Sequence, residues 1–192
     1  MACISLTCGL MLGLSLFVRA SLGFDCTFEH GMCGWKQSWD DAGYWMRRSG
    51  RSPSYYTGPL SDRTPGSSTN YYCYSNGGSH SSSNAVLLSP IVKATDVRQF
   101  IWRFSFWYNM YGSDIGRLNV YKTPVNGRLS EGRVIFSRHG QQTSSSEWLE
   151  GEIYITDVAS SFRIAFEAIR QYLYDDLGHI AIDDVTISDL PT

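Results

Sequence analysis

Apolar and polar residues alternate with a period of two along most of the chain after residue 24. The clearest case is RQFIWRFSFWYNM, residues 98–110, where every second side chain is aromatic. A helix would distribute these side chains around its circumference, whereas a strand places all of them on one face. The aromatic set that shares this parity is Phe100, Trp102, Phe104, Phe106 and Tyr108.

Shorter segments repeat this pattern and are separated by turn residues. An Asn-Gly pair at positions 126–127 precedes RVIFSR and is typical of a hairpin. No segment carries an apolar stripe of helical period, so the pattern predicts an all-β jelly-roll sandwich of two antiparallel sheets with eight or more strands. The other strand-like segments are 70–75, 84–92, 117–123, 147–158 and 160–169.

The last predicted strand, GHIAIDDVTIS, changes parity in its middle. Ile180 and Ile182 are even-numbered, whereas Val185 and Ile187 are odd-numbered. Keeping all four side chains in the core requires one extra residue, so we expect a β-bulge near the two adjacent aspartates. A bulge there would bring both carboxylates to one rim of the sandwich.

Residues 1–23 form an apolar leader with Arg19 as its only charged side chain. The apolar run from Ile4 to Val18 suits the core of a signal peptide, with cleavage after Ala20 or Gly23. An uncleaved anchor or a buried segment is the alternative interpretation. The expected mature protein is secreted and extracellular, with one domain over residues 24–190, a tail at 191–192 and no membrane span after cleavage.

Composition and motifs restrict the function. The chain has 16 basic and 18 acidic residues, and no run of basic residues is long enough to follow a phosphate backbone, so nucleic acid is not an expected partner. No Gly-x-Ser-x-Gly, His-Glu-x-x-His or phosphate-binding loop occurs in the sequence, so we predict that the protein is not an enzyme. Glycoside hydrolysis by two facing carboxylates is the alternative that the sequence leaves open. The scattered histidines His30, His80, His139 and His179 are predicted to lie at the surface.

Several motifs occur in an order that resembles one known family. They are FDCTFEHGMCGW (24–35), WDDAGYWMRRSG (39–50), YTGPLSDRT (56–64), FWYNMYGSDIGRLNVY (106–121) and HIAIDDVTI (179–187). The ordered set resembles the MAM domain of meprins, neuropilins and receptor-type tyrosine phosphatases. The resemblance implies a jelly-roll fold and an extracellular adhesion or assembly module without catalytic activity of its own.

Three cysteines lie outside the leader. In an oxidising compartment Cys26 and Cys33 are expected to form a short-range disulfide. Their spacing is not that of a Cys-x-x-Cys redox motif, and His30 with two thiolates is too small a set for zinc. Cys73 is then unpaired, and it is interpreted either as a buried free thiol or as the site of an intermolecular disulfide.

Acidic residues gather near both ends of the predicted domain, which a jelly roll places side by side. Carboxylate oxygens suit Ca²⁺, and the resemblance implies a structural calcium held by acids of these motifs. The alternative is that these acids are solvated caps, turn residues or partners of Arg47 and Arg48. The candidate ligands are Glu29, Asp40, Asp41, Asp183 and Asp184, with Asp25 nearby in sequence.

The expected partner is an extracellular protein, including a second copy of the same chain. One alternative is a lectin-like sandwich that stacks tyrosines on sugar rings, which would make carbohydrate the partner. Another is a soluble regulator of a different extracellular complex. The tyrosines considered for a sugar surface are Tyr55, Tyr56, Tyr71, Tyr72, Tyr74, Tyr108 and Tyr111.

Overall fold

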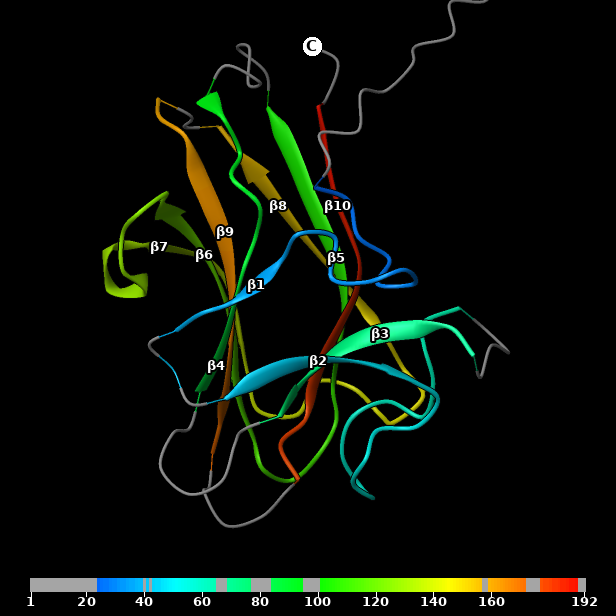
Figure 1. The fold of residues 1–192 in the computed structure, drawn as a ribbon. Coiled ribbons are helices and arrows are strands. Elements are labelled where there is room, and N and C mark those ends of the chain that lie inside the picture. The colour runs from blue at the N-terminus through cyan, green and yellow to red at the C-terminus, as the bar shows by residue number, and fades with distance from the viewer. Residues whose placement is uncertain are drawn as a thin grey trace, which may run out of the picture.

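A computed structural model describes residues 24–39, 41, 43–64, 69–76, 84–94, 101–156, 159–171 and 177–189. The predicted leader, His80, Asp40 and the last three residues lie outside this set. Within it, two five-stranded antiparallel sheets face each other (Figure 1), which confirms the predicted sandwich. None of these residues forms a helix long and apolar enough to cross a membrane.

The first sheet has the strand order β1-β4-β9-β6-β7, and the second has the order β2-β3-β10-β5-β8. A 3-10 turn, η2 (Leu129–Glu131), lies between β6 and β7. The strands of the first sheet are β1 (Lys36–Gln37), β4 (Asn84–Leu88), β6 (Ile115–Pro124), β7 (Arg133–His139) and β9 (Phe162–Arg170). Those of the second are β2 (Tyr44–Ser49), β3 (Tyr71–Asn76), β5 (Trp102–Met110), β8 (Leu149–Ile155) and β10 (Ile180–Asp189).

Aromatic rings from both sheets fill the space between the layers. Phe166 of β9 lies at the centre, and its ring centroid is 4.9 Å from Phe106 and 6.0 Å from Phe104, both on β5. Two tryptophans complete the cluster, with Trp35 at 5.4 Å and Trp45 at 6.3 Å from Phe166. The period-two alternation of β5 and β9 therefore produces one continuous core, as the sequence predicts.

The β-bulge predicted in the last strand is present. The pairing of β10 with β5 shifts register between Asp183 and Thr186, and Asp184 has a left-handed backbone with φ of 44°. Ile180, Ile182, Val185 and Ile187 all face the core as a result. The bulge interrupts the regular strand next to both aspartates, at the rim where other acidic side chains lie.

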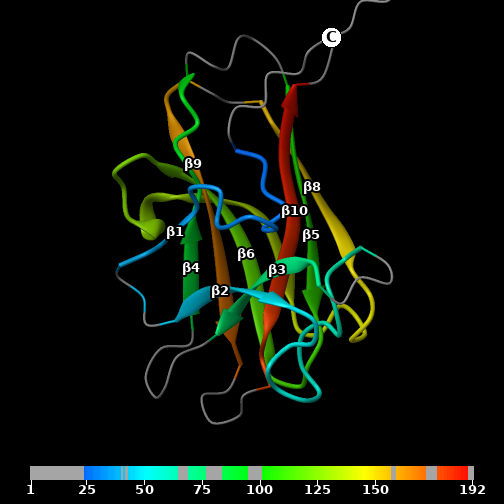
Figure 2. The same cartoon turned by 45° about the vertical axis from the view of Figure 1, so that its right-hand side comes forward.

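The N-terminal segment lies beside the last strand, as the jelly-roll prediction requires. Cys26 and Val185 form an antiparallel bridge, in which each backbone N–H donates to the carbonyl oxygen of the other at 2.8 Å. Asp25 extends this contact because its Oδ1 accepts a hydrogen bond from the N–H of Ile187 at 3.0 Å. Figure 2 shows the blue N-terminal segment running next to the red strand β10.

Candidate functional site

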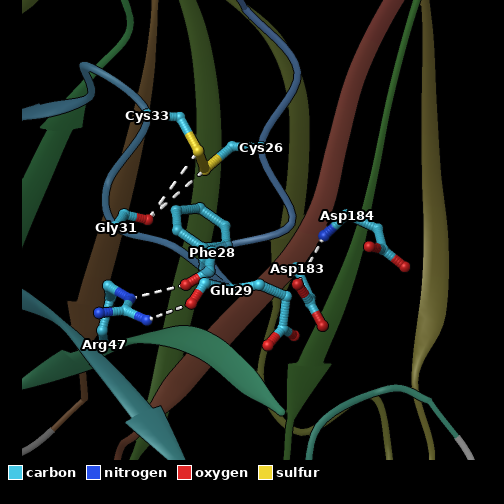
Figure 3. The surroundings of a disulfide bond; sticks show 8 residues. All are labelled: Cys26, Phe28, Glu29, Gly31, Cys33, Arg47, Asp183 and Asp184. Carbon is cyan, nitrogen blue, oxygen red and sulfur yellow. Dashed lines mark hydrogen bonds between the residues drawn. A yellow bond between two sulfur atoms is a disulfide. The ribbon is translucent and has the colours of Figure 1, made fainter.

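The predicted disulfide between Cys26 and Cys33 is formed, and it closes a short loop beside β10 of the second sheet (Figure 3). The Cα atoms of the two cysteines are 5.7 Å apart. Inside the loop Phe28 has φ of 57°, and Cys33 itself has φ of 48°. Left-handed backbone is unfavourable for such residues, so the disulfide and the buried ring of Phe28 must hold the loop in this shape.

Arg47 of β2 fixes the same loop from the other side. Its Nε donates to the carbonyl oxygen of Phe28 at 2.6 Å, and its Nη2 donates to that of Glu29 at 2.8 Å. The guanidinium also stacks on the ring of Tyr71, 4.1 Å from the centroid. Arg47 therefore binds backbone carbonyls, and the side chain of Glu29 is left to point towards β10 (Figure 3).

Four carboxylates meet where this loop reaches the bulge of β10, and we call Glu29, Asp62, Asp183 and Asp184 the acidic group. Asp183 is 1% exposed, and its Oδ1 accepts a hydrogen bond from the N–H of Asp184 at 2.7 Å. Asp183 also shares a hydrogen bond with the buried side chain of Asp62. Asp184 pairs with Arg63 at 3.3 Å, and Glu29 Oε1 accepts from the N–H of Tyr71 at 3.0 Å.

The surroundings of Asp183 disfavour its charged form. Burial is the largest cause, and the hydrogen bond with Asp62 and the charge of Asp184 add to it, raising the pKa of Asp183 to about 9. Burial also raises the pKa of Asp184, although the cation Arg63 partly offsets that shift. At neutral pH the acidic group therefore holds a proton on Asp183.

The structure brings together three of the five predicted metal ligands: Glu29, Asp183 and Asp184. Asp41 lies elsewhere, at the first sheet, where its Oδ2 accepts a hydrogen bond from the N–H of Val86. Asp40 is outside the described residues. The candidate calcium ligands predicted from the sequence do not include Asp62. This residue belongs to the motif YTGPLSDRT, on which the family resemblance partly rests.

The donor chemistry of the acidic group suits a hard cation, because all its side-chain donors are carboxylate oxygens. As they stand, however, no three histidine, cysteine or acidic residues of the described part of the chain are arranged so that they could hold a metal ion. A proton and Arg63 instead compensate the charges of Asp183 and Asp184. Occupancy by a cation would require the hydrogen bond between Asp183 and Asp62 to open.

Cys73 is a free thiol with no exposed surface. Burial raises its pKa well above the ordinary value, and the nearby charge of Asp183 raises it further, while Arg47 opposes both. These features agree with the buried-thiol interpretation. An intermolecular disulfide would require this part of β3 to leave the core.

A buried serine–histidine pair lies at the other end of the second sheet. Ser52 Oγ and His179 Nδ1 are 2.7 Å apart, and both residues are buried. The predicted surface position of His179 is therefore wrong: the preceding turn places its ring edge-on against Tyr74 at 5.2 Å. Because no substrate can reach the pair in this conformation, its role is to attach the loop after β2 to β10.

That loop, residues 50–60, presents two tyrosines to solvent. Tyr55 is 69% exposed and Tyr56 is 72% exposed, and Tyr56 has a left-handed backbone with φ of 64°. The base of the loop is fixed because Gly58 N–H donates to Tyr111 O at 2.7 Å and Leu60 N–H donates to Ser145 O at 2.8 Å. Of the seven tyrosines considered for a sugar-binding surface, Tyr72, Tyr74 and Tyr108 are buried and cannot contribute to it.

Together, the two five-stranded sheets and the short-range disulfide define a disulfide-bonded jelly-roll β-sandwich domain. The model of the MAM domain, meprin/A5/mu, matches residues 26–191. The chain therefore belongs to the MAM domain family, as the sequence motifs predict.

Comparisons with known proteins agree with this membership. The chain is 35% identical over 167 residues to thyroid hormone-induced protein B of Xenopus laevis, covering 86% of this chain and 23% of that protein. It is also 35% identical over 163 residues to human MAM domain-containing protein 2, covering 84% and 22%. The chain thus spans about a fifth of the length of these relatives.

Among solved structures, the fold is similar to the K2 cleaved adhesin domain of Lys-gingipain. The TM-score is 0.57 at 17% identity, and the match covers 86% of this chain and 98% of that one. At this identity the likeness concerns the fold alone.

Proposed function

We propose that this domain is a non-catalytic extracellular module that binds another protein, including a second copy of itself. Family membership supports the class of function, and the exposed tyrosine pair of loop 50–60 supports the surface. Tyrosine is enriched at the centres of protein interfaces because its ring buries a large area at a small entropic cost. A loop that is already fixed loses little further freedom when a partner binds.

Neighbouring exposed side chains extend this surface along β2. Tyr44 is 57% exposed and Met46 is 45% exposed, both on the edge strand that leads into the loop. Arg51 stacks on the ring of Tyr55 at 4.3 Å and adds a cation to the same region. The proposed contact surface therefore combines aromatic, thioether and guanidinium groups, which are the side chains enriched at interfaces.

Light scattering and bead aggregation of the purified domain test this proposal. The double variant Tyr55→Ser/Tyr56→Asn is expected to weaken association at least tenfold, and Asn at position 56 tolerates the left-handed backbone. Ile91→Ser, a matched removal of an exposed apolar side chain elsewhere, should leave association unchanged. A wild-type domain that stays monomeric and aggregates no beads would contradict self-association. Unchanged binding by the double variant would exclude the tyrosine surface.

We also propose a structural role for Ca²⁺ at the acidic group. The family resemblance and the oxygen-only donor set support it, with Glu29, Asp62, Asp183 and Asp184 as the residues that would hold the ion. When no cation is bound, a proton on Asp183 supplies positive charge to the acidic group. A bound divalent cation would take over this role. Its effect would be to join the disulfide loop, the loop after β2 and the bulge of β10.

Thermal melting with and without calcium tests this role. At a free calcium concentration about a hundred times its dissociation constant, the domain is expected to gain about 2.7 kcal/mol of stability relative to EDTA. Asp183→Asn should remove most of this gain, whereas Asp41→Asn should retain it, because Asp41 lies at the first sheet. Identical melting curves in calcium and EDTA would rule out the proposed role.

A further inference from the structure

Four arginines of the β6–β7 hairpin, residues 115–139, form no ion pair with any acidic residue that the structure describes. They are Arg117, Arg128, Arg133 and Arg138, and all four are exposed. Arg138 lies over the ring of Phe136 at 4.3 Å from its centroid, which holds its guanidinium at the surface. A surface that carries several uncompensated guanidinium groups attracts anions.

Other arginines of the described chain are used within the fold. Arg63, Arg103 and Arg170 pair with carboxylates of Asp184, Glu150, Glu152 and Asp114. Arg47, Arg48 and Arg163 donate to backbone carbonyls, and Arg51 stacks on the ring of Tyr55. Arg138 of the hairpin likewise donates to the carbonyl oxygen of Ser137. Of the eight described arginines without an ion pair, four lie on this hairpin, although the whole chain has a net charge of −2. The other four are divided between β2 with its following loop and β9.

Strand pairing turns a dispersed sequence pattern into a cationic edge. Arg133 pairs with Lys122, and Arg138 pairs with Leu118 next to Arg117. Positions 118 and 122 are separated by roughly 13 Å along an extended strand. Opposed residues of paired strands share a face, so Arg138 and the pair Arg133 and Lys122 lie on one face of this edge strand. Arg117 points to the opposite face, because it neighbours the buried Leu118, and Arg128 lies in the turn.

The exposed carboxylate of Glu131 lies beside Gly127 at the turn and offsets part of the positive charge there, whereas β6 and β7 themselves contain no acidic residue. Glu131 in η2 is the only acidic residue between positions 115 and 139. Glu167 of β9 lies next to β6 but is only 7% exposed, and donors of the protein occupy both of its carboxylate oxygens. Oε1 accepts from Asn84 at 3.1 Å, and Oε2 accepts from Asn119 and Tyr121, each at 2.9 Å.

A cleft at the turn of the hairpin indicates what kind of anion fits. The cleft has a volume of about 200 Å³, and Trp39, 86% exposed, stands at its rim. An exposed indole offers a flat apolar face for a sugar ring, and nearby hydroxyl, amide and guanidinium groups can bind ring substituents. The polar residues that line the cleft are Ser38, Thr123, Asn126 and Arg128.

We propose that the β6–β7 hairpin and the cleft at its turn bind a sulfated polysaccharide. Guanidinium groups bind tetrahedral oxyanions through paired hydrogen bonds, so the arginines take the sulfates while Trp39 takes one sugar ring. Because the domain is of extracellular type, a sulfated polysaccharide is a more suitable polyanionic ligand for it than nucleic acid. The inference is independent of the tyrosine surface, which lies in the loop that follows β2.

Heparin provides the probe, with binding measured by titration calorimetry and by the salt concentration that elutes the domain from a heparin column. Arg133→Gln/Arg138→Gln is expected to weaken heparin binding at least tenfold and to reduce the dependence of log K on log[NaCl]. Arg48→Gln/Arg51→Gln removes the same charge from the other sheet and should change affinity less than twofold. Trp39→Ala should weaken binding about tenfold and leave the salt dependence unchanged.

The proposal is overturned if the wild-type domain does not bind heparin at 0.15 M NaCl, roughly physiological ionic strength. It is also overturned if both double variants lose affinity equally. Duplex DNA and vesicles containing phosphatidylserine serve as competitors. If DNA or the vesicles bind as tightly as heparin, and Trp39→Ala does not change heparin binding, the domain attracts polyanions in general. That result would exclude a polysaccharide site. Melting temperatures within a few degrees of the wild type confirm that each variant is folded.

Discussion

Without divalent cations, the unfolding free energy of the wild-type domain is expected to fall as pH rises from about 4 towards 9, and Asp183→Asn should remove most of this decrease. The folded-state pKa of Asp183 is about 9, against an ordinary value of 3.8, so the folded protein retains a proton that the unfolded chain releases. The stabilisation is complete below the unfolded pKa and is lost as pH approaches the folded one. One proton corresponds to a slope of at most about 1.4 kcal/mol per pH unit.

Urea denaturation of the wild type and Asp183→Asn across this pH range, in EDTA, measures the effect. Asparagine has nearly the same shape, and its side-chain oxygen can still accept from the N–H of Asp184. Asp25→Asn, an exposed carboxyl that bonds to the N–H of Ile187, is the matched control and should keep the wild-type slope. Parallel pH profiles for the wild type and Asp183→Asn would show that the acidic group does not hold this proton.

Phe166→Ala is expected to destabilise the domain by about 3–5 kcal/mol, which is a large part of the total for a single domain. The ring is fully buried and contacts aromatic rings of the opposite sheet and of the N-terminal segment. Its removal would leave a cavity that the rigid surrounding rings cannot fill. Equilibrium denaturation with the disulfide intact measures the loss.

Two further variants keep this test informative. Phe166→Leu retains most of the apolar volume and should cost less than the alanine variant, so it provides a value if Phe166→Ala does not fold. Phe136→Ala removes a ring that is only partly buried on β7 and should also cost less. A near-wild-type stability for Phe166→Ala would contradict the central position of this ring.

The parts of the fold that depend on short-range periodicity could be predicted from sequence. Alternating aromatics define β5, and the parity change between Ile182 and Val185 locates the bulge, because the requirement to bury apolar side chains acts residue by residue. The family motifs also indicate that the first and last segments lie side by side in the fold. These features place Glu29 near Asp183 without any structural information.

The features that could not be predicted from the sequence depend on contacts between segments that are distant along the chain. Asp62 lies in an irregular loop, and nothing in its local pattern shows that it meets Asp183 more than a hundred positions later. His179 follows a turn glycine, which suggested exposure, yet Ser52 and Tyr74 enclose it. The cationic edge of the β6–β7 hairpin depends on strand register, which brings Arg133 opposite Lys122 although the two are separated in sequence by a turn.

The bridge between Cys26 and Val185 has a mechanical consequence. Because the first and last segments run antiparallel, a force applied at the two ends of the domain would separate them like a zipper, one hydrogen bond after another, starting where Asp25 meets Ile187. The Cys26–Cys33 bond limits this peeling, since tension that passes through the sulfurs cannot extend the six residues between them, 27–32. The stretching force would therefore act on the strands of the two sheets before it could extend the loop that carries Glu29.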